Sequence, residues 1–393
     1  MFKKFIEDDT PKNRDIRNIF RLIQKHGPIS KAELSEMSKM KLTTLARMID
    51  ELHKANFIKE HGVGDSGGGR PPVLFHVEPN LGYLISVFIS RMYTSIGLYN
   101  LHYQSIEKIN FVMTPHHTPE FVLNEIVQCI KSFMIKHHFS EKELLGIGIG
   151  AIGPLDSQKG MILCPDPFFA PGWADVPIVD YLKKVFDVKI LLEDGSNTSV
   201  LGEFSECSDH TNNILYCING WGIGCGVIAD GKLFCGKTGD ASGYGHIIIQ
   251  VNGHTCTCGK RGCLLAYTSL YSIMNELSDR YPAINWGMQE AGRLSTIEIT
   301  NRLIEDLWAS SDVVLNSAYY YGIGVANMAK LYHSDLVILS GPLIYRYPKY
   351  YETVVETAQE YVGSNKVIFS QGALGEEAGM VGGAVMVFES HFK

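Results

Sequence analysis

The sequence has no long apolar run, no leader-like start and no even set of cysteines. No stretch of the 393 residues reaches the roughly 18 consecutive apolar residues typical of a membrane helix. The most apolar segment, Leu144–Leu155, alternates with glycine over a strand-like length. The first residues mix both charges without an apolar core, so we expect no secretory signal. Nine cysteines spread along the chain favour reduced thiols in a cytoplasm over a disulfide framework.

Composition predicts two or three folded domains with a charge difference between the two ends. A chain with 45% hydrophobic and 20% charged residues is too apolar to be disordered. Residues 1–80 carry 14 lysines and arginines against 11 acids, whereas the other residues carry 21 against 31. A weakly basic head on an acidic body suits contact with a polyanion, although ordinary variation in charge would look the same.

Apolar residues at helical spacing predict three short helices in the first 60 residues. The first ends before Gly27-Pro28, because proline cannot continue a helix. The second begins after Ser30, which precedes Glu33 by the spacing of a capping box. The third ends near Asn56, where a left-handed cap is expected. The apolar stripes comprise Ile16, Ile19, Phe20 and Ile23 in the first helix, and Leu45, Met48, Ile49 and Leu52 in the third.

This arrangement is the helix-turn-helix pattern, and the third helix is the expected recognition helix. Its face opposite the apolar stripe carries Lys41, Thr43, Thr44 and Arg47, which we expect to contact DNA bases and phosphates. Two short strands around a glycine-rich tip then predict a wing whose Arg70 enters a minor groove. A helical protein-interaction module is the alternative interpretation.

Beyond residue 79, strands alternate with helices, which predicts an α/β body of two sheets with flanking helices and a cleft between them. A three-stranded meander is expected at 84–90, 95–100 and 105–113, followed by a helix at 119–136, strands at 146–155 and 188–194, a hairpin at 214–234, a helix and strand at 325–341 and a final helix at 372–390.

The chain resembles the ROK family of repressors, open reading frames and sugar kinases along nearly its whole length. The matching segments, in family order, are GGRPP, GIGIGAIGPLD, PGWADVPI, EDGSNTSVLGE, NGWGIGCGVIADGKL, GYGHIIIQVNGHTCTCGKRGCLLAYTS and AGMVGGA. The resemblance implies a winged helix-turn-helix domain at 1–79 and a two-lobed actin-like and hexokinase-like (ribonuclease-H-like) ATPase-type fold at 80–393. One lobe would span about 80–196 plus the C-terminal helix near 376–393, and the other about 197–375. Such proteins are usually dimers or tetramers.

Three cysteines close together, with a histidine before them, predict a structural zinc site. Cys256, Cys258 and Cys263 lie within eight residues, and His246 precedes the first by ten. Three thiolates and one imidazole complete a tetrahedral shell with no place for a reacting water. His246 matches the histidine ligand of the family, while His254 is the rival for the fourth position. Three buried thiols without a metal are the other alternative.

The resemblance also shows which kinase residues are missing. The family's catalytic aspartate, within E-N-D-x-N, corresponds to Gly195, which cannot accept a proton. The acidic residue of the first phosphate loop corresponds to Phe88, and the hydroxyl residue of the second loop corresponds to Trp221. Three residues that the kinase reaction needs are thus replaced, by Gly195, Phe88 and Trp221, which predicts that the chain is not an enzyme.

The sugar-contacting residues are also reduced in number. Tyr244 and Leu265 stand where the family's sugar binders have glutamates, and each lost hydrogen-bond partner costs ~1 to 3 kcal/mol. The remaining residues expected to bind an effector are Asp194, Asn197, Gly172 and His246. The effector is therefore expected to be a sugar, a modified or phosphorylated sugar or a different molecule, or to be absent altogether.

Together these features predict a cytoplasmic DNA-binding regulator, a repressor of sugar-related genes, that forms a homodimer or homotetramer on double-stranded operator DNA. An ATP-dependent hexose kinase with a regulatory DNA-binding head is the alternative, and a protein-interaction scaffold is a third interpretation.

Overall fold

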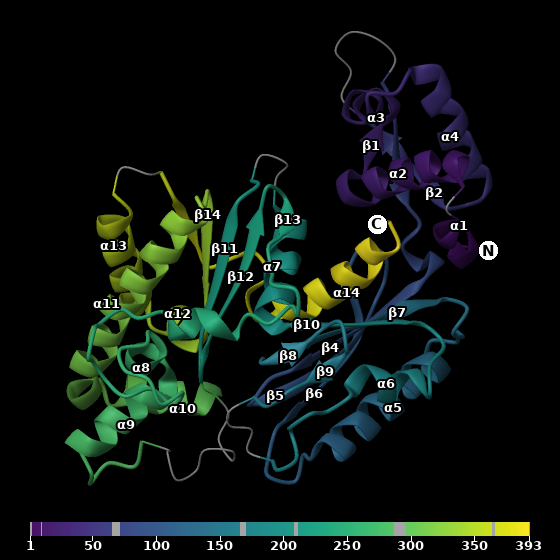
Figure 1. Ribbon diagram of the computed structural model, residues 1–393. Helices are drawn as coiled ribbons and strands as arrows, with labels where there is room; N and C mark the ends of the chain where they lie inside the picture. The colour runs from purple at the N-terminus through teal and green to yellow at the C-terminus, as the bar shows by residue number, and fades with distance from the viewer. Residues whose placement is uncertain are drawn as a thin grey trace.

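The computed structural model describes residues 2–8, 10–64, 71–165, 170–207, 211–286, 296–363 and 366–392. A small head lies on one of two lobes, and the C-terminal helix ends where the head and that lobe meet (Figure 1). Among these residues, no helix has the length and apolar content needed to cross a bilayer.

The head contains four helices and a three-stranded antiparallel sheet of order β1-β3-β2. Its elements are α1 (Phe2–Glu7), α2 (Pro11–His26), β1 (Ile29–Ser30), α3 (Lys31–Ser38), α4 (Leu42–Lys54), β2 (Ile58–Val63) and β3 (Val73–Val77). The three predicted helices are confirmed as α2, α3 and α4. Helix α1 was not predicted, because six residues are too few to display a helical period.

The predicted start of α3 and end of α4 are both present. The Ser30 hydroxyl accepts a hydrogen bond from the Glu33 amide at 3.3 Å, and the Glu33 carboxylate accepts one from the Ser30 amide at 2.9 Å. Asn56 follows α4 with φ of 58°, the left-handed conformation expected there. The sequence therefore defines the helix boundaries of the head locally.

The first lobe is built on a five-stranded sheet of order β10-β7-β4-β5-β6. Its strands are β4 (Tyr83–Ile89), β5 (Tyr93–Tyr99), β6 (Ser105–Val112), β7 (Leu144–Ala151) and β10 (Lys189–Asp194), with α5 (Pro119–Lys136) and α6 (Ile178–Lys183) on one face. A short 3-10 helix (Pro79–Leu81) precedes the sheet, and β8 (Leu155–Asp156) pairs with β9 (Met161–Ile162) beside it. The predicted meander is confirmed as β4, β5 and β6, and β7 is buried throughout.

The second lobe is built on a five-stranded sheet of order β13-β12-β11-β14-β15. Its strands are β11 (Ile214–Asn219), β12 (Ile223–Ala229), β13 (Lys232–Leu233), β14 (Leu336–Ser340) and β15 (Ile368–Ser370). Its helices are α8 (Leu265–Thr268), α9 (Leu270–Arg280), α10 (Thr296–Glu305), α11 (Leu307–Leu331), α12 (Pro342–Arg346) and α13 (Pro348–Val362), with a 3-10 helix at Ser242–His246. The predicted hairpin is the antiparallel pair β11 and β12.

Two helices between the sheets, α7 (Gly195–Glu206) and α14 (Ala378–Ser390), are in close contact. A Cβ atom at Gly382 would lie 1.6 Å from the Thr198 carbonyl oxygen, and one at Gly202 would lie 2.2 Å from the Ala378 carbonyl oxygen. Glycine is therefore required at both positions. Helix α14 begins six residues later than predicted, because 372–377 form a loop and a short 3-10 helix (Gly375–Glu377).

The apolar core of the head continues into the first lobe and α14. Phe20 in α2 stacks on Phe392, with ring centroids 6.3 Å apart and planes 9° apart. The same buried cluster includes Leu84 and Tyr99 from the sheet and Phe388 from α14. The head is thus packed against the body by apolar side chains from both.

Candidate functional site

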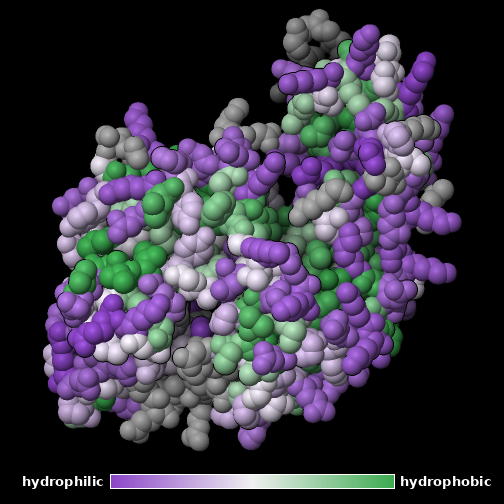
Figure 2. All heavy atoms as spheres, viewed as in Figure 1, coloured by the Kyte–Doolittle hydropathy of each residue, from purple (hydrophilic) through white to green (hydrophobic). Residues whose placement is uncertain are grey.

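The predicted DNA-contacting side chains lie on the outer surface of the head. Lys41, the N-cap residue of α4, is exposed, as are Thr43, Thr44 and Arg47. On the opposite side of the helix, Leu45, Ile49 and Leu52 are at most 1% exposed. The outer surface of the head is predominantly polar (Figure 2). The first two turns of α4 therefore present two basic and two hydroxyl side chains to solvent, while the stripe behind them holds the helix in place.

The wing strands are present as β2 and β3, which pair in antiparallel register from Ile58 with Val77 to Val63 with Val73. The wing tip and its Arg70 lie outside the described residues. The predicted contact of Arg70 with a minor groove therefore remains a prediction.

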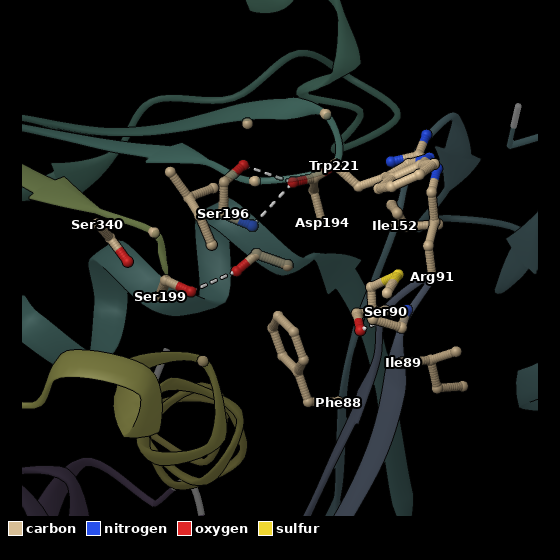
Figure 3. Close-up of a pocket in the computed structure, with 18 of the residues that line it drawn as sticks. Phe88, Ile89, Ser90, Arg91, Ile152, Asp194, Ser196, Ser199, Trp221 and Ser340 are labelled. Atoms are coloured by element: carbon tan, nitrogen blue, oxygen red, sulfur yellow. Dashed lines mark hydrogen bonds between the residues drawn. The ribbon is translucent and has the colours of Figure 1, made fainter. Parts of the chain in front are cut away.

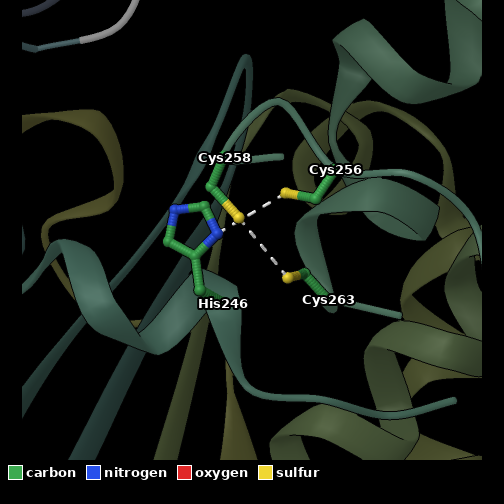
Figure 4. A group of neighbouring side chains, drawn as sticks. All are labelled: His246, Cys256, Cys258 and Cys263. Carbon is green, nitrogen blue, oxygen red and sulfur yellow. Dashed lines mark hydrogen bonds between the residues drawn. The ribbon is translucent and has the colours of Figure 1, made fainter. Parts of the chain in front are cut away.

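The four predicted metal ligands come together in the second lobe (Figure 4). The ligand atoms of His246, Cys256, Cys258 and Cys263 all lie within 4.8 Å of one another. The Sγ atoms of Cys258 and Cys263 are 3.8 Å apart, and Sγ of Cys256 is 3.5 Å from Nδ1 of His246. Bond lengths of about 2.3 Å for Zn–S and about 2.0 Å for Zn–N give tetrahedral edges of about 3.8 and 3.5 Å. These two distances match such edges, and the four ligand atoms are close enough together to hold a metal ion.

A tight turn brings the cysteines together. The amide of Cys256 donates to the Lys260 carbonyl at 2.8 Å, and the amide of Gly259 donates back to the Cys256 carbonyl at 2.9 Å. Burial lowers the pKa of His246, which favours the neutral imidazole that a metal binds. His254, the rival ligand, instead stacks on Tyr267 with ring centroids 4.4 Å apart. The geometry therefore places His246, and not His254, with the three cysteines.

A cavity of about 760 Å³ lies between the two lobes, beside the Cys/His cluster. Its walls come from the β4–β5 turn, the start of α7, the β11–β12 turn and the start of α14, so both lobes and both central helices contribute. His246 and Cys258 also line it, which joins the cluster to the cavity wall. A cavity of this size, mostly apolar with several polar groups, is typical of a small-molecule site.

Asp194 is the buried carboxylate of this cavity (Figure 3). It caps α7, because its Oδ1 accepts hydrogen bonds from the Ser196 amide at 2.9 Å and the Ser196 hydroxyl at 2.5 Å. Burial raises its pKa to about 6, and the charge of Asp240 adds to the increase, while the bonds from Ser196 oppose it. Asp194 therefore faces the cavity as a hydrogen-bond acceptor that carries a desolvation cost when ionised.

Two other predicted effector residues have different surroundings. The Asn197 side chain donates to Oε1 of Glu193 and to the Gly239 carbonyl, both at 3.0 Å, and is not among the described residues that line the cavity. Gly172, with φ of 90°, packs near Pro119 and is also absent from the described cavity wall. Asn197 is therefore placed to hold the Glu193–Gly239 region, and Gly172 to form a turn beside α5.

Of the two residues at the glutamate positions, Leu265 lines the cavity and Tyr244 does not belong to its described wall. Leu265 lines the wall with its apolar side chain. Tyr244 instead packs against the second lobe, where its hydroxyl accepts a hydrogen bond from Tyr332 at 3.4 Å. Neither side chain offers a carboxylate to a hydroxylated ligand.

The Phe88 ring packs beside Gly195 at the start of α7. A Cβ atom at Gly195 would lie 3.0 Å from Cζ of Phe88, and one at Gly379 would lie 2.4 Å from its Cε2. A Cβ at Gly150 would also lie 3.0 Å from this ring. The phenyl ring therefore sits among three glycines. Gly195 is therefore part of the packing around Phe88.

A contact between the lobes was not found by sequence reasoning. Met92, in the β4–β5 turn of the first lobe, is 5% exposed and belongs to the core of the second lobe. Beside it, the Arg91 side chain (Figure 3) reaches the β11–β12 turn, where a Cβ at Gly222 would lie 3.0 Å from its Nη1. The side chains of Arg91 and Met92 thus join the β4–β5 turn to the second lobe. An arginine and a methionine next to a turn carry no sequence signal for such a contact.

Comparison with known proteins agrees with this arrangement. The family model described as "ROK family" matches residues 85–390, and that described as "Winged helix-turn-helix DNA-binding" matches residues 16–59. A protein named xylose repressor from Bacillus spizizenii (strain ATCC 23059 / NRRL B-14472 / W23) is 28% identical over 385 residues, which are 95% of this chain and 94% of that protein.

Two solved structures are similar to the chain over different shares of its length. The crystal structure of a ROK family transcriptional regulator, a homologue of the E. coli MLC protein, has a TM-score of 0.73 and 20% identity, and covers 97% of both chains. The ROK hexokinase from Thermus thermophilus has a TM-score of 0.65 and 24% identity, and covers 98% of that chain but only 78% of this one. The likeness to the hexokinase thus leaves part of this chain unmatched, and the actin-like and hexokinase-like fold expected for the body is confirmed. The chain belongs to the ROK family and joins a winged helix-turn-helix domain to the two-lobed ROK domain.

Proposed function

We propose that this protein is a cytoplasmic transcriptional repressor that binds operator DNA through α4 and senses a sugar or sugar derivative in the interlobe cavity. The observation that carries the proposal is the pairing of an exposed recognition helix with a cavity whose phosphate-transfer groups are replaced by Phe88, Gly195 and Trp221. The resemblance to a xylose repressor over 95% of the chain supports the same conclusion.

The effector is proposed to bind beside Asp194, within reach of His246. A buried carboxylate accepts hydrogen bonds from sugar hydroxyls, and cavity-lining serines such as Ser196 add further polar groups. Asn197 would act indirectly, through its bonds to Glu193 and Gly239. Gly172 would shape the turn beside α5 and would not contact the ligand. D-Xylose is the first compound to test, because it is named by the relative described above.

The Cys/His cluster is proposed to hold one structural zinc ion. Four donor atoms at tetrahedral spacing leave no position for a reacting water, so the ion would stabilise the loop and take no part in chemistry. Because His246 and Cys258 also line the cavity, the ion would hold that wall in place. Loss of the metal should therefore weaken both the fold and ligand binding.

Regulation is proposed to follow from linkage between the cavity and the head. A ligand that binds one arrangement of the lobes better than another shifts the population toward it, and DNA affinity changes by the same coupling free energy. A homodimer or homotetramer would present two or more heads, since a single small head contacts too little DNA for high specificity.

The experiment is a titration of the full chain against DNA fragments from upstream of its own gene, followed by fluorescence anisotropy at several salt concentrations. Two lysines provide a matched pair, because Lys41 is the N-cap of α4, Lys54 is its last residue and both are exposed. Lys41→Ala should lower the salt slope by about one, and Arg47→Ala should weaken binding roughly tenfold, while Lys54→Ala should bind like the wild type. A flat salt response, or equal effects at both lysines, would remove α4 as the recognition helix.

A further inference from the structure

We infer that the interlobe cavity holds a ligand of two linked rings, a glycoside whose first ring lies beside Asp194 and whose second ring stacks on a platform formed by Tyr93 and Val112. This inference rests on the proposed function, because it names the class of effector that the same cavity takes. The size of the cavity, one face of a β-hairpin and the position of Phe88 support it.

The cavity is larger than a monosaccharide requires. Cavities of roughly 300 to 1,000 Å³ bury most of a drug-sized ligand, and a single pentose or hexose is much smaller than such a ligand. At about 760 Å³, the interlobe cavity lies in the upper part of that range. One sugar ring beside Asp194 would therefore leave much of the wall uncovered.

The platform is one face of the hairpin formed by β5 and β6. Tyr93 pairs with Val112 in the antiparallel register. Ser95 pairs with Asn110 in the same way, and all four residues line the cavity. Alternate side chains of a strand share a face, so the two pairs form one continuous surface. Tyr93 is 37% exposed and Val112 is 42% exposed, which leaves apolar surface available to a ligand there.

This surface combines the groups that a hydroxylated or aromatic ring needs. The phenol ring of Tyr93 offers an apolar face for stacking, while Ser95 and Asn110 supply hydrogen-bond donors and acceptors beside it. Two residues before Asn110 on β6, Lys108 forms an ion pair with Glu377, and both of these residues also line the cavity. A second sugar ring and an aryl group would meet the same chemistry.

Phe88 connects the Asp194 end of the cavity to the platform (Figure 3). A Cβ atom at Gly195, the residue after Asp194, would lie 3.0 Å from the Phe88 ring. On its other side, the Phe88 ring stacks with Tyr93, with centroids 6.0 Å apart and planes 22° apart. The platform therefore begins one stacked ring beyond the start of α7, where a second ring linked to one beside Asp194 would lie.

The test is calorimetric titration of the full chain with D-xylose, xylobiose and phenyl β-D-xyloside. At least one of the two-ring compounds should bind roughly tenfold more tightly than D-xylose, because only a second ring can stack on Tyr93. In Tyr93→Ala this ratio of affinities should fall to near one. The matched control is Tyr361→Ala, which removes a 40% exposed tyrosine of α13 outside the described cavity wall and should keep the wild-type ratio.

Two further variants separate stacking from a general loss of structure. Tyr93→Phe keeps the ring and should keep the tighter binding, while Val112→Ala should reduce the ratio severalfold. Equal affinities for D-xylose and both glycosides, or a ratio that survives Tyr93→Ala, would overturn the inference and leave the proposed function standing. Failure of all three compounds to bind would overturn both the inference and the proposed sugar effector.

Discussion

Replacing Asp194 by asparagine should stabilise the protein near neutral pH and have little effect in acid. Burial raises the pKa of this carboxyl to about 6, from a reference value of 3.8. The native state therefore binds the proton more tightly than the unfolded chain does. The contribution of Asp194 to the unfolding free energy is therefore greatest below pH 3.8. It declines as the pH rises through 6, because the folded protein must then hold an ionised carboxylate in its interior.

The magnitude follows from the difference in pKa. The difference between the pKa of Asp194 in the unfolded chain, 3.8, and in the folded protein, about 6, corresponds to at most ~3 kcal/mol of unfolding free energy lost at pH 7.5. Asparagine is uncharged at every pH, is similar in shape and is equally favoured as an N-cap. Its side-chain oxygen should still accept the bonds from Ser196. The charge, and not the cap, is thus the main difference.

The assay is chemical unfolding of the wild type, Asp194→Asn and the control Asp279→Asn at pH 4.5 and 7.5. Asp279 is an exposed carboxylate on α9. Asp194→Asn should gain about 1 to 3 kcal/mol relative to the wild type at pH 7.5 and about a third of that gain at pH 4.5, while the control should stay near the wild type at both. An equal difference at the two pH values, or a less stable variant at pH 7.5, would refute the idea that the ionised carboxylate carries a burial cost.

Gly195→Asp should not produce phosphoryl transfer, because the new Cβ would lie 3.0 Å from the Phe88 ring. We expect the variant to lose ~1 to 3 kcal/mol of unfolding free energy and to show no sugar-dependent ADP release. Measurable turnover would contradict this expectation. Metal analysis of the purified protein should find about one zinc per chain, and Cys263→Ala should remove it and lower the unfolding temperature, whereas Cys129→Ala should retain the metal. Ser30→Ala should cost ~1 kcal/mol by thermal unfolding through loss of the α3 capping box, an effect that Ser35→Ala should not reproduce in full.

Much of the local structure could be predicted because its causes lie within a few residues along the chain. The spacing of Ser30 and Glu33 determines where α3 begins, and the apolar stripe of α4 determines which face is exposed. Cysteines two and five residues apart predicted a metal-binding loop, which the short turn from Cys256 to Cys263 forms. The start of α14 was misplaced because glycines and glutamates before Ala378 do not distinguish a loop from a first helical turn.

Sequence alone therefore predicted the three main helices of the head, the meander of the first lobe, the β11–β12 hairpin and the family. Only the tertiary structure decided that the Phe88 ring packs among three glycines, which histidine joins the cysteines, and how the head packs on the body. The Arg21–Glu389 pair spans 368 positions, and residues 88 and 379 are 291 positions apart, so neither contact follows a local period. Such contacts arise only when the lobes and the head pack together, because packing depends on the shape of surfaces assembled from distant segments.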